Sequence, residues 1–452
     1  MFKKFTNGCV NLVQRFLPDA FIFCIILTIV VYVLALIATG TGPLQVAVAW
    51  GSGVWSLLAF SMQMVLVLVL GTAFANAPAV KNLIIRLASI PKTPASAIIF
   101  VTAISTICCW LNWGFGLVVG ALLAKEVAKK VEGLDYRLLM ASAYSGFVVW
   151  HAGASGSIPL QLADYNDTIN AQTAGAVTES VPTSLTIFAP WNLIVCLVVL
   201  IAFCLVNAKM HPDKEHTVTV DPSLLVDEEV EYPAPTTPAE KLENSVILTA
   251  IVAILGIVYL IYYFATSGFN LSLNIVNLIF LILGIIFNKT PIGYVRAIND
   301  AAKSAGGIIL QFPFYAGIMG MMTFAGEGGT SLAGIISDFF VNVSNQVTFP
   351  FFTFLSAGIV NFFVPSGGGQ WAVQAPIVMP AGKELGLSPA ISGMAIAWGD
   401  AWTNMLQPFW ALPALGIAGL GARDIMGYCA IDLIVSGIIV AIGFLVLVPI
   451  MA

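Results

Sequence analysis

The sequence contains few charged residues. Only 9% of its 452 residues are Asp, Glu, Lys or Arg, and 59% are hydrophobic, whereas a soluble protein carries roughly a quarter charged residues. So few charges cannot cover the surface of a soluble chain of this length, and we expect lipid to be the solvent for most of that surface. The net charge of −5 shows no basic footprint of the kind that nucleic-acid binding requires.

Patterns for covalent or metal chemistry are also missing. The seven cysteines have neither zinc nor redox spacing and are expected to be small buried side chains. The sequence shows no nucleophilic triad and no metal-ligand cluster, and Gly367-Gly368-Gly369 lacks the strand–loop–helix context that phosphate binding needs. The sequence therefore predicts a protein that is not an enzyme and holds no cofactor apart from a coupling ion, Na⁺ or H⁺.

Long apolar runs are abundant. Seven are long enough to cross a bilayer, at about residues 20–40, 54–77, 184–206, 245–264, 270–287, 306–324 and 429–449. Two more, 138–163 and 391–419, are interrupted by Gly, Pro, Ser and Asn, which predicts broken helices. Two others, 93–124 and 348–381, exceed one crossing and have polar, Gly-rich middles, which is typical of re-entrant helical hairpins. The predicted fold is an all-α polytopic membrane protein.

The distribution of Lys and Arg indicates an orientation. With the N-terminus in the cytoplasm and each hairpin returning to its own side, 17 of the 18 Lys and Arg residues lie on the cytoplasmic side and only Lys383 lies outside. This is the bias that the positive-inside rule describes. We therefore expect the first hairpin to enter from the cytoplasm, the second to enter from the periplasm, and the C-terminus to be periplasmic.

The two halves share a spacing. Pro159, in the first helix break, follows Asn112 in the first hairpin by 47 residues, and Pro408 follows Asn361 by the same 47. Because the hairpins are expected to enter from opposite faces, the two repeats are predicted to be inverted, an arrangement typical of carriers with a site near the bilayer midplane. The predicted organisation is residues 1–206 as the first inverted repeat, 207–244 as a cytoplasmic linker, and 245–452 as an extra helix plus the second inverted repeat.

The hairpin tips and helix breaks predict the substrate site. A broken helix exposes N–H groups at one end, which favour a carboxylate, and C=O groups at the other, which can bind a small cation. The candidate substrate-binding residues are Asn112, Trp113, Gly114, Ser155, Ser157, Ser366, Gly367, Gly368, Gly369, Thr403, Asn404 and Gln407. Four of these, Asn112, Ser157, Ser366 and Asn404, are also candidate Na⁺ ligands. Hairpin packing through small residues and helix capping are the alternative roles.

Two ionisable residues are candidates for handling the coupling ion. Asp400 is the acid expected deep in the membrane, where a carboxylate is costly and is a functional candidate by default. It can bind Na⁺, carry a proton or pair with a structural donor. His151 directly precedes the first break and has either a structural or a proton-handling role. Asp432 is expected nearer the membrane interface.

Five sequence runs resemble one family. The runs 112–121, 311–317, 364–369, 407–414 and 421–429 resemble the AtoE-type short-chain fatty acid transporter family, within the ion transporter superfamily of secondary carriers, and the resemblance covers nearly the whole chain. It implies uptake of carboxylates such as butyrate or acetoacetate across a bacterial inner membrane. It also implies a mobile transport domain that moves like an elevator against a scaffold domain, often in a homodimer. The tips read Asn112-Trp113-Gly114 and Pro365-Ser366-Gly367, which differs from the Ser-Asn-Thr motifs of sodium-coupled dicarboxylate relatives.

The leading prediction is thus an ion-coupled secondary carrier for short-chain monocarboxylates, with the organic anion, the lipid bilayer and a second copy of the chain as partners. One alternative is a carrier of the same architecture for dicarboxylates or for Na⁺/H⁺ exchange. Another is an anion channel, whose flux would neither saturate nor show counterflow.

Overall fold

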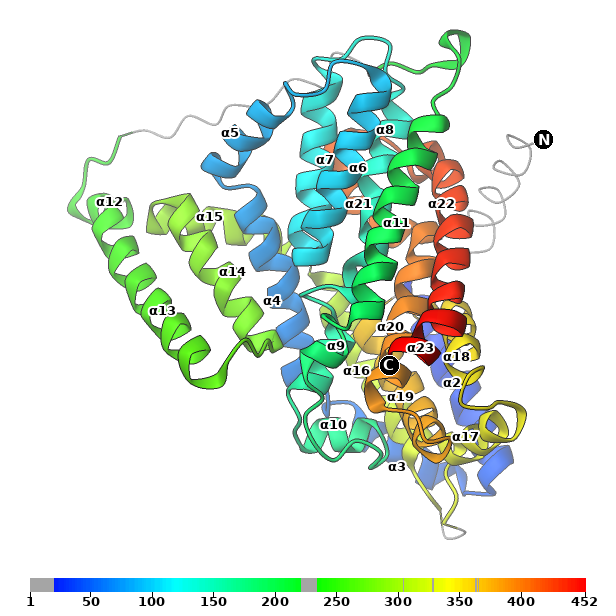
Figure 1. Ribbon diagram of the computed structural model, residues 1–452. Helices are drawn as coiled ribbons and strands as arrows, with labels where there is room; N and C mark the ends of the chain where they lie inside the picture. The colour runs from blue at the N-terminus through cyan, green and yellow to red at the C-terminus, as the bar shows by residue number, and fades with distance from the viewer. Residues whose placement is uncertain (1–19, 221–233, 304, 327–328, 362–363, 365) are drawn as a thin grey trace.

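The computed structural model describes residues 20–220, 234–303, 305–326, 329–361, 364 and 366–452 (Figure 1). Predictions that concern residues 1–19, residues 221–233 of the linker, and Phe362, Phe363 and Pro365 of the second tip lie outside the described residues. Within the described part of the chain the elements are helical, and the β pairing there is one isolated bridge between Ala325 and Ser331. The predicted all-α fold is confirmed.

The first half of the chain forms twelve helical elements in the described range. They are α2 (Ala20–Thr39), α3 (Pro43–Gly53), α4 (Leu58–Ala75), α5 (Pro78–Leu87), α6 (Pro94–Leu111), α7 (Trp113–Ala128), α8 (Tyr136–Ser145), η1 (Gly146–Ala152), α9 (Ser157–Ala163), α10 (Asp167–Gln172), η2 (Thr183–Leu185) and α11 (Pro190–Lys209).

The second half begins after the linker. Its described elements, with the short η3 (Lys214–His216) before them, are α12 (Pro238–Glu243), α13 (Val246–Ser267), α14 (Leu273–Asn288), α15 (Pro291–Ala302), α16 (Gly306–Thr323), α17 (Leu332–Val343), α18 (Phe349–Asn361), α19 (Gly367–Glu384), α20 (Pro389–Thr403), η5 (Asn404–Leu406), α21 (Pro408–Ala418), α22 (Ala422–Ile442), η6 (Gly443–Leu447) and α23 (Val448–Met451).

Several helices are long and apolar enough to cross a membrane. By length and composition, six segments among the described residues qualify: Leu58–Ala75, Pro94–Leu111, Pro190–Lys209, Pro238–Ser267, Gly306–Thr323 and Ala422–Met451. Their apolar side chains are partly exposed, as expected of a surface that contacts lipid. The helix content and the apolar spans together describe a multi-pass membrane protein.

In each of the two predicted hairpins, one residue with extended backbone stands directly before the second helix. Asn112 has extended backbone (φ −155°, ψ 122°) between α6 and α7, and its side chain accepts a hydrogen bond from the Phe115 amide at 2.9 Å. Ser366 does the same at the start of α19, where its Oγ accepts from the Gly369 amide at 3.3 Å. Such caps satisfy amides that have no partner within the helix, so each second helix can begin inside the protein.

The two predicted breaks fall between short helices. The first runs from the end of α8 at Ser145 through η1 to the start of α9 at Ser157, and the second from the end of α20 at Thr403 through η5 to Pro408 at the start of α21. Figure 1 draws α6 and α7 in its upper part and α18 and α19 in its lower part. The inverted relation of the halves and the division at residues 206 and 244 stay predictions.

The helices pack in two groups. In one, α6, α7, α8 and η1 pack on one another, α18 packs on α20, and α22 packs on α11 and α8. In the other, α16 packs on α2 and α3, and α14 and α15 pack on α4. Contacts of α4 with α7 and of α16 with α19 join the groups (Figure 1), so both hairpins contact the α4–α16 side.

The side chain of Asp432, which was expected nearer the membrane interface, is enclosed by other parts of the protein. It is 0% exposed on α22, because the Asn207 side chain from α11 covers it. With its amide nitrogen turned toward the carboxylate, Asn207 lies 2.8 Å from Asp432 Oδ1 and accepts from Ser145 Oγ at 3.1 Å. The sequence position of Asp432 near a helix end did not reveal this cluster with Asn207 and Ser145.

Candidate functional site

The first break docks onto the first hairpin tip. The Trp113 amide donates to Ser155 Oγ at 3.0 Å, and the Ala154 amide donates to the Trp110 carbonyl at 2.7 Å. Gly153 lies so close to that carbonyl that an added Cβ would overlap it. The two predicted features, separated by about forty residues in the sequence, are therefore one structural unit.

Aromatic rings surround the first tip. The Trp113 ring is edge-on to Trp410 at 5.3 Å and to Trp150 at 5.8 Å between centroids, and Trp150 stacks on Phe147 at 5.5 Å. Trp113 is 2% exposed. Rings in these geometries hold one another in place, so the tip has rigid apolar walls.

The polar atoms left over at this tip are donors. Asn112 Oδ1 is occupied by the Phe115 amide, so the free group of that side chain is its Nδ2. Within the described part of the chain, Asn112 Nδ2 and the indole N–H groups of Trp113 and Trp150 are buried without a hydrogen-bond partner. Buried donors without partners are costly, and an anion would satisfy them.

A cavity of about 520 Å³ opens at this tip. Trp113 and Gly114 of the first tip line it together with Trp410 of α21. Its remaining lining residues are Leu68, Thr72, Asn76, Leu117, Val118, Asp300, Ala301, Lys303, Ile308 and Ile417. A mostly apolar pocket with a few polar groups is the usual form of a small-molecule site.

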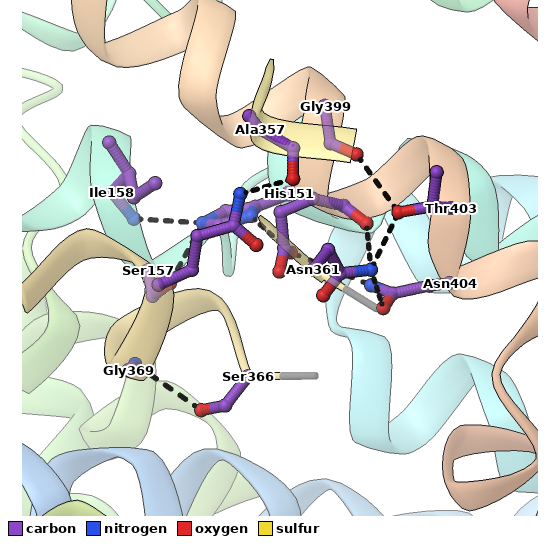
Figure 2. Close-up of polar contacts among 12 residues, drawn as sticks. His151, Ser157, Ile158, Ala357, Asn361, Ser366, Gly369, Gly399, Thr403 and Asn404 are labelled. Atoms are coloured by element: carbon purple, nitrogen blue, oxygen red, sulfur yellow. Dashed lines mark hydrogen bonds and ion pairs between the residues drawn. The ribbon is translucent and has the colours of Figure 1, made fainter. Parts of the chain in front are cut away.

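His151, which lies near Ser157 and Asn361 in Figure 2, forms a buried pair with Asp400. His151 Nδ1 lies 2.9 Å from Asp400 Oδ2, and both side chains are 0% exposed. His151 Nε2 lies 2.8 Å from Ser157 Oγ and 3.2 Å from the Ile158 amide nitrogen. Because a backbone N–H can only donate, Nε2 is the acceptor, and the ring proton lies on Nδ1 and is donated to Asp400.

Asn361 connects α18 to the second break. Its Nδ2 lies 2.9 Å from each of three oxygens, the Asp400 carbonyl, Thr403 Oγ1 and Asn404 Oδ1 (Figure 2). The Gln407 side chain donates to the Asn361 carbonyl at 3.0 Å, and Thr403 Oγ1 donates to the Gly358 carbonyl at 3.0 Å. The second tip and the second break are thus also one unit, and the Thr403 hydroxyl and the Gln407 side-chain nitrogen are used within it.

The glycines of the second tip contact both groups of helices. A Cβ on Gly367 would lie 2.6 Å from His151 Cε1 and 2.9 Å from Ser157 Oγ, so only a glycine lets α19 begin directly against the first break. Gly368 lies against Phe60 and Phe312, and Gly369 lies against the Tyr315 ring. The start of α19 is therefore placed between the first break and α4 with α16.

Sequence reasoning did not select Asn361 or Gln370 as site residues, although both are fully buried at the second tip. Asn361 could have been selected, because it occupies the position that matches Asn112 in the 47-residue spacing. Gln370 carried no such signal, since a glutamine in the first turn of a helix is common. Nothing in the sequence indicated Trp150 as a wall of the first tip either.

A second cavity lies toward the other end of α4. It measures about 240 Å³ and is lined by Phe60 and Gln63 from the start of α4 together with Gln161, Asp164 and Asn166 from α9 and the segment that follows. The first cavity instead contacts Leu68 and Thr72, nearer the end of α4. At 1.5 Å per helical residue, Phe60 and Thr72 are separated by about 18 Å along the axis.

No classical metal site is found among the described residues, since no group of three or more His, Cys, Asp or Glu side chains there could hold a metal ion. The predicted Na⁺ ligands are of a different kind, since they are mainly neutral oxygens.

The chain is similar to known proteins over its whole length. A family model described as short chain fatty acid transporter matches residues 1–447. Two relatives carry the name of that family: a protein of Escherichia coli (strain K12) is 46% identical over 98% of this chain and 99% of its own length, and one of Haemophilus influenzae (strain ATCC 51907 / DSM 11121 / KW20 / Rd) is 44% identical with the same coverage. The crystal structure of the Alcanivorax borkumensis YdaH transporter, 16% identical, superposes with a TM-score of 0.62 over 96% of this chain and 98% of that one, which shows a shared fold.

Proposed function

The chain belongs to the short-chain fatty acid transporter family, and from that premise we propose that it is a secondary active carrier for short-chain monocarboxylates of the butyrate or acetoacetate type. Membership of the family supports a multi-pass membrane transporter. The proposal adds the substrate class, the site, the coupling and the motion, in a bacterial inner membrane with a cytoplasmic N-terminus and a periplasmic C-terminus.

The observation that carries the proposal is the set of unpaired donors at the first tip. Asn112 Nδ2 and the Trp113 indole N–H are buried without partners, and Trp113 and Gly114 line the 520 Å³ cavity. A carboxylate at this point would accept from both side chains and would lie at the start of α7, where the helix dipole favours negative charge. The acyl chain would then lie against Leu117 and Ile417.

The apolar walls favour a monocarboxylate over a dicarboxylate. Trp113 lines one end of the cavity and follows Asn112 directly in the chain. The lining beyond it is apolar except for Thr72, Asn76 and the ion pair of Asp300 with Lys303. A second carboxylate would have to be desolvated against that lining, which costs several kcal/mol. Exchange of Na⁺ for H⁺ would leave a cavity of this size without a role.

An elevator-like motion is supported by the two cavities. They lie toward opposite ends of α4, and the tips contact α4 and α16 between them. A sliding movement of the hairpin-bearing group along α4 would open one cavity while closing the other, as alternating access requires. Asp400 and His151 are proposed to couple this motion to an ion. The homodimer expected from the superfamily stays a prediction.

The test is transport by the purified protein in liposomes. Labelled butyrate, acetoacetate and succinate are offered under separate Na⁺ and pH gradients, and counterflow of butyrate is measured without any gradient. We expect saturable uptake and counterflow of the two monoacids. Uptake of succinate alone would contradict the proposed substrate class, and flux that neither saturates nor shows counterflow would indicate a channel.

A further inference from the structure

Asp432 is a buried acid that the proposed substrate site does not use. It is 0% exposed on α22, and the side chains of Asn207 on α11 and Ser145 on α8, which form its cluster, are also 0% exposed. It lines neither of the two cavities described above. Helices α22, α11 and α8 belong to the group that contains the first hairpin. Because an enclosed carboxylate within the membrane is costly, Asp432 is a functional candidate.

No cation balances Asp432 among the described residues. Helix α22 packs on α8, α11, α20, α21, η5 and η6, and the charged residues on these elements and on α22 itself are Arg137, Lys209, Asp400, Arg423 and Asp424. No ion pair in the described part of the chain includes Asp432. Lys209 stands two positions after Asn207 and therefore lies on another side of α11. Arg423 stands nine positions before Asp432, which is about 13.5 Å along the helix.

The other ionisable residues on these elements are neutral thiols and phenols: Tyr136, Tyr144, Cys196, Cys204, Tyr428 and Cys429. Cys429, one turn before Asp432 on α22, is the one that faces it and is fully buried. The hydroxyls of Tyr136 and Tyr144 donate to the carbonyls of Ala418 and Asn404. The polar group in direct contact with the carboxyl group is therefore the Asn207 amide.

The Asn207 amide fits the carboxyl group in two orientations. One amide atom lies 2.8 Å from Asp432 Oδ1, and the other lies 3.1 Å from Ser145 Oγ and 3.4 Å from Thr102 Oγ1. With the nitrogen toward Asp432, the amide donates to a carboxylate and its oxygen accepts from Ser145. With the oxygen toward Asp432, the nitrogen donates to Ser145 and Thr102. Two oxygens 2.8 Å apart then attract each other only if Asp432 carries a proton and donates it.

We propose that Asp432 is a proton-binding site of the carrier and that the Asn207 amide turns over when the proton binds or leaves. Each orientation gives both ends of the amide a partner, so neither state leaves the amide unpaired in the interior. The proton is taken from water on the side where substrate binds, forms an O–H bond at Asp432 Oδ1, and returns to water on the other side. The inference rests on the proposed carrier function, because it names a proton carried with the substrate.

The arrangement suits a proton better than a metal ion. A hard cation needs several oxygen ligands, whereas the group that faces the ionised Asp432 is an N–H donor, which repels a cation. A bound proton also offsets the charge of a monocarboxylate held by the same group of helices. Ser145 ends α8, and η1 of the first break begins at the next residue, so the change in the Ser145 hydrogen bond occurs next to the unit that holds the first tip.

Infrared difference spectra of the purified full chain, recorded between about pH 5 and about pH 9, test the site. We expect a carboxylic acid C=O band at the acid end that is lost in Asp432→Asn. Ser436→Ala is the matched control and should keep the band, because Ser436 is buried one turn further along α22 and donates to the Asp432 backbone carbonyl at 2.7 Å. The absence of any band that Asp432→Asn removes would overturn the proposal.

Asn207→Leu tests the partner without removing the acid. The protonated carboxyl group would lose the acceptor for its O–H, and a carboxyl group without a hydrogen bond absorbs at higher wavenumber. We expect the band to move in that direction, and an unmoved band would contradict the role of the amide. This variant also keeps the proposal open to refutation if Asp432→Asn does not fold, as judged by its Tm.

Transport in liposomes tests whether the proton moves with the substrate. Asp432→Asn resembles the protonated state and has no proton to release, so accumulation of butyrate driven by a pH gradient should fall at least about tenfold, within the usual range of coupling between two ligands. Counterflow at equal pH should remain, because exchange of loaded carriers requires no release of the proton. Ser436→Ala should accumulate butyrate like the original chain.

The outcomes separate this inference from the proposed function. If butyrate exchanges and Asp432→Asn accumulates it as well as the original chain does, the carrier stands and the proton site falls. If Asp432→Asn removes the acid band and the original chain does not exchange butyrate, the proton site stands and the proposed substrate falls.

Discussion

An asparagine side chain carries one acceptor and two donors, and the one that stays free decides which ligand it suits. At Asn112 the cap on the Phe115 amide uses the oxygen and leaves the nitrogen free, whereas at Asn361 the contacts with three oxygens use the nitrogen and leave the oxygen free. Two residues that match in sequence spacing therefore present opposite polarity. We expect an anion at the first, where a donor is free.

The substitution Asn112→Asp tests whether the side chain of Asn112 binds the carboxylate of the substrate. The substitution keeps the oxygen that caps α7 and replaces the free donor by an oxygen that repels a carboxylate. We expect folding to be retained and KM for butyrate to rise about 10- to 100-fold, the factor for losing a hydrogen bond to a charged group. The measurement is saturation of initial uptake in liposomes, with Tm as the check on folding. An unchanged KM would place the carboxylate elsewhere.

Helix ends inside the membrane need partners for their free backbone groups, and this explains how the tips and breaks are built. The Trp113 amide at the start of α7 is satisfied by Ser155 from the first break, and Ala154 of the break is satisfied by the Trp110 carbonyl at the end of α6. At the second break, Tyr144 donates from α8 to the Asn404 carbonyl at 2.5 Å. Each interruption is thus completed by a different element of the chain.

The substitution Gly153→Ala tests whether the first break must pack closely against the first hairpin tip. An added Cβ would overlap the Trp110 carbonyl, so the first break would have to move away from the tip. We expect a loss of roughly 1–3 kcal/mol in stability, seen as a lower Tm, together with weaker butyrate uptake. The control is Gly416→Ala in α21, where an added Cβ has no neighbour within 4 Å and where alanine is the better helix former. Equal Tm in the two variants would show that the close contact is not needed.

At the scale of the whole molecule, lipid-facing surface and buried polar clusters coexist. Helix α13 exposes apolar residues such as Ile247, Leu255 and Ile261, whereas Asp400 and Asp432 are fully enclosed. The bilayer solvates the exposed apolar surface. The buried carboxylates are tolerated only where side-chain partners surround them. The lipid-facing surface and the shielded carboxylates therefore lie in different parts of the molecule.

Labelling of single introduced cysteines tests the proposed orientation of the whole molecule in the membrane. Lys383 is exposed at the end of α19 and is the residue expected outside, while Lys214 is exposed in η3 and is expected inside. A membrane-impermeant maleimide should label Lys383→Cys in cells whose outer membrane is permeable to it, and should label Lys214→Cys only after the inner membrane is opened. The original chain, whose six cysteines in the described residues are at least partly buried, is the background control. The reverse pattern would invert the topology.

The sequence by itself determined the class of the protein and the places where its helices break. Few charges and long apolar runs predict a membrane protein because lipid tolerates only helices with satisfied backbones or closed barrels, and Asn112, Ser366 and the proline-containing segments indicate breaks through local chemistry that needs no partner. The family followed from sequence runs long enough to be specific.

Only the tertiary structure decided which polar atoms are free. Thr403 and Gln407 were reasonable ligands by type, yet their side chains bond to Gly358 and Asn361 within the protein. Gln370 looked ordinary in sequence, yet its side-chain oxygen is buried without a hydrogen-bond partner. The physical reason is that a side chain's donors and acceptors are fixed by its type, while the groups that satisfy them come from residues as distant as Asn192 and Trp398, which bond at 2.9 Å across 206 positions.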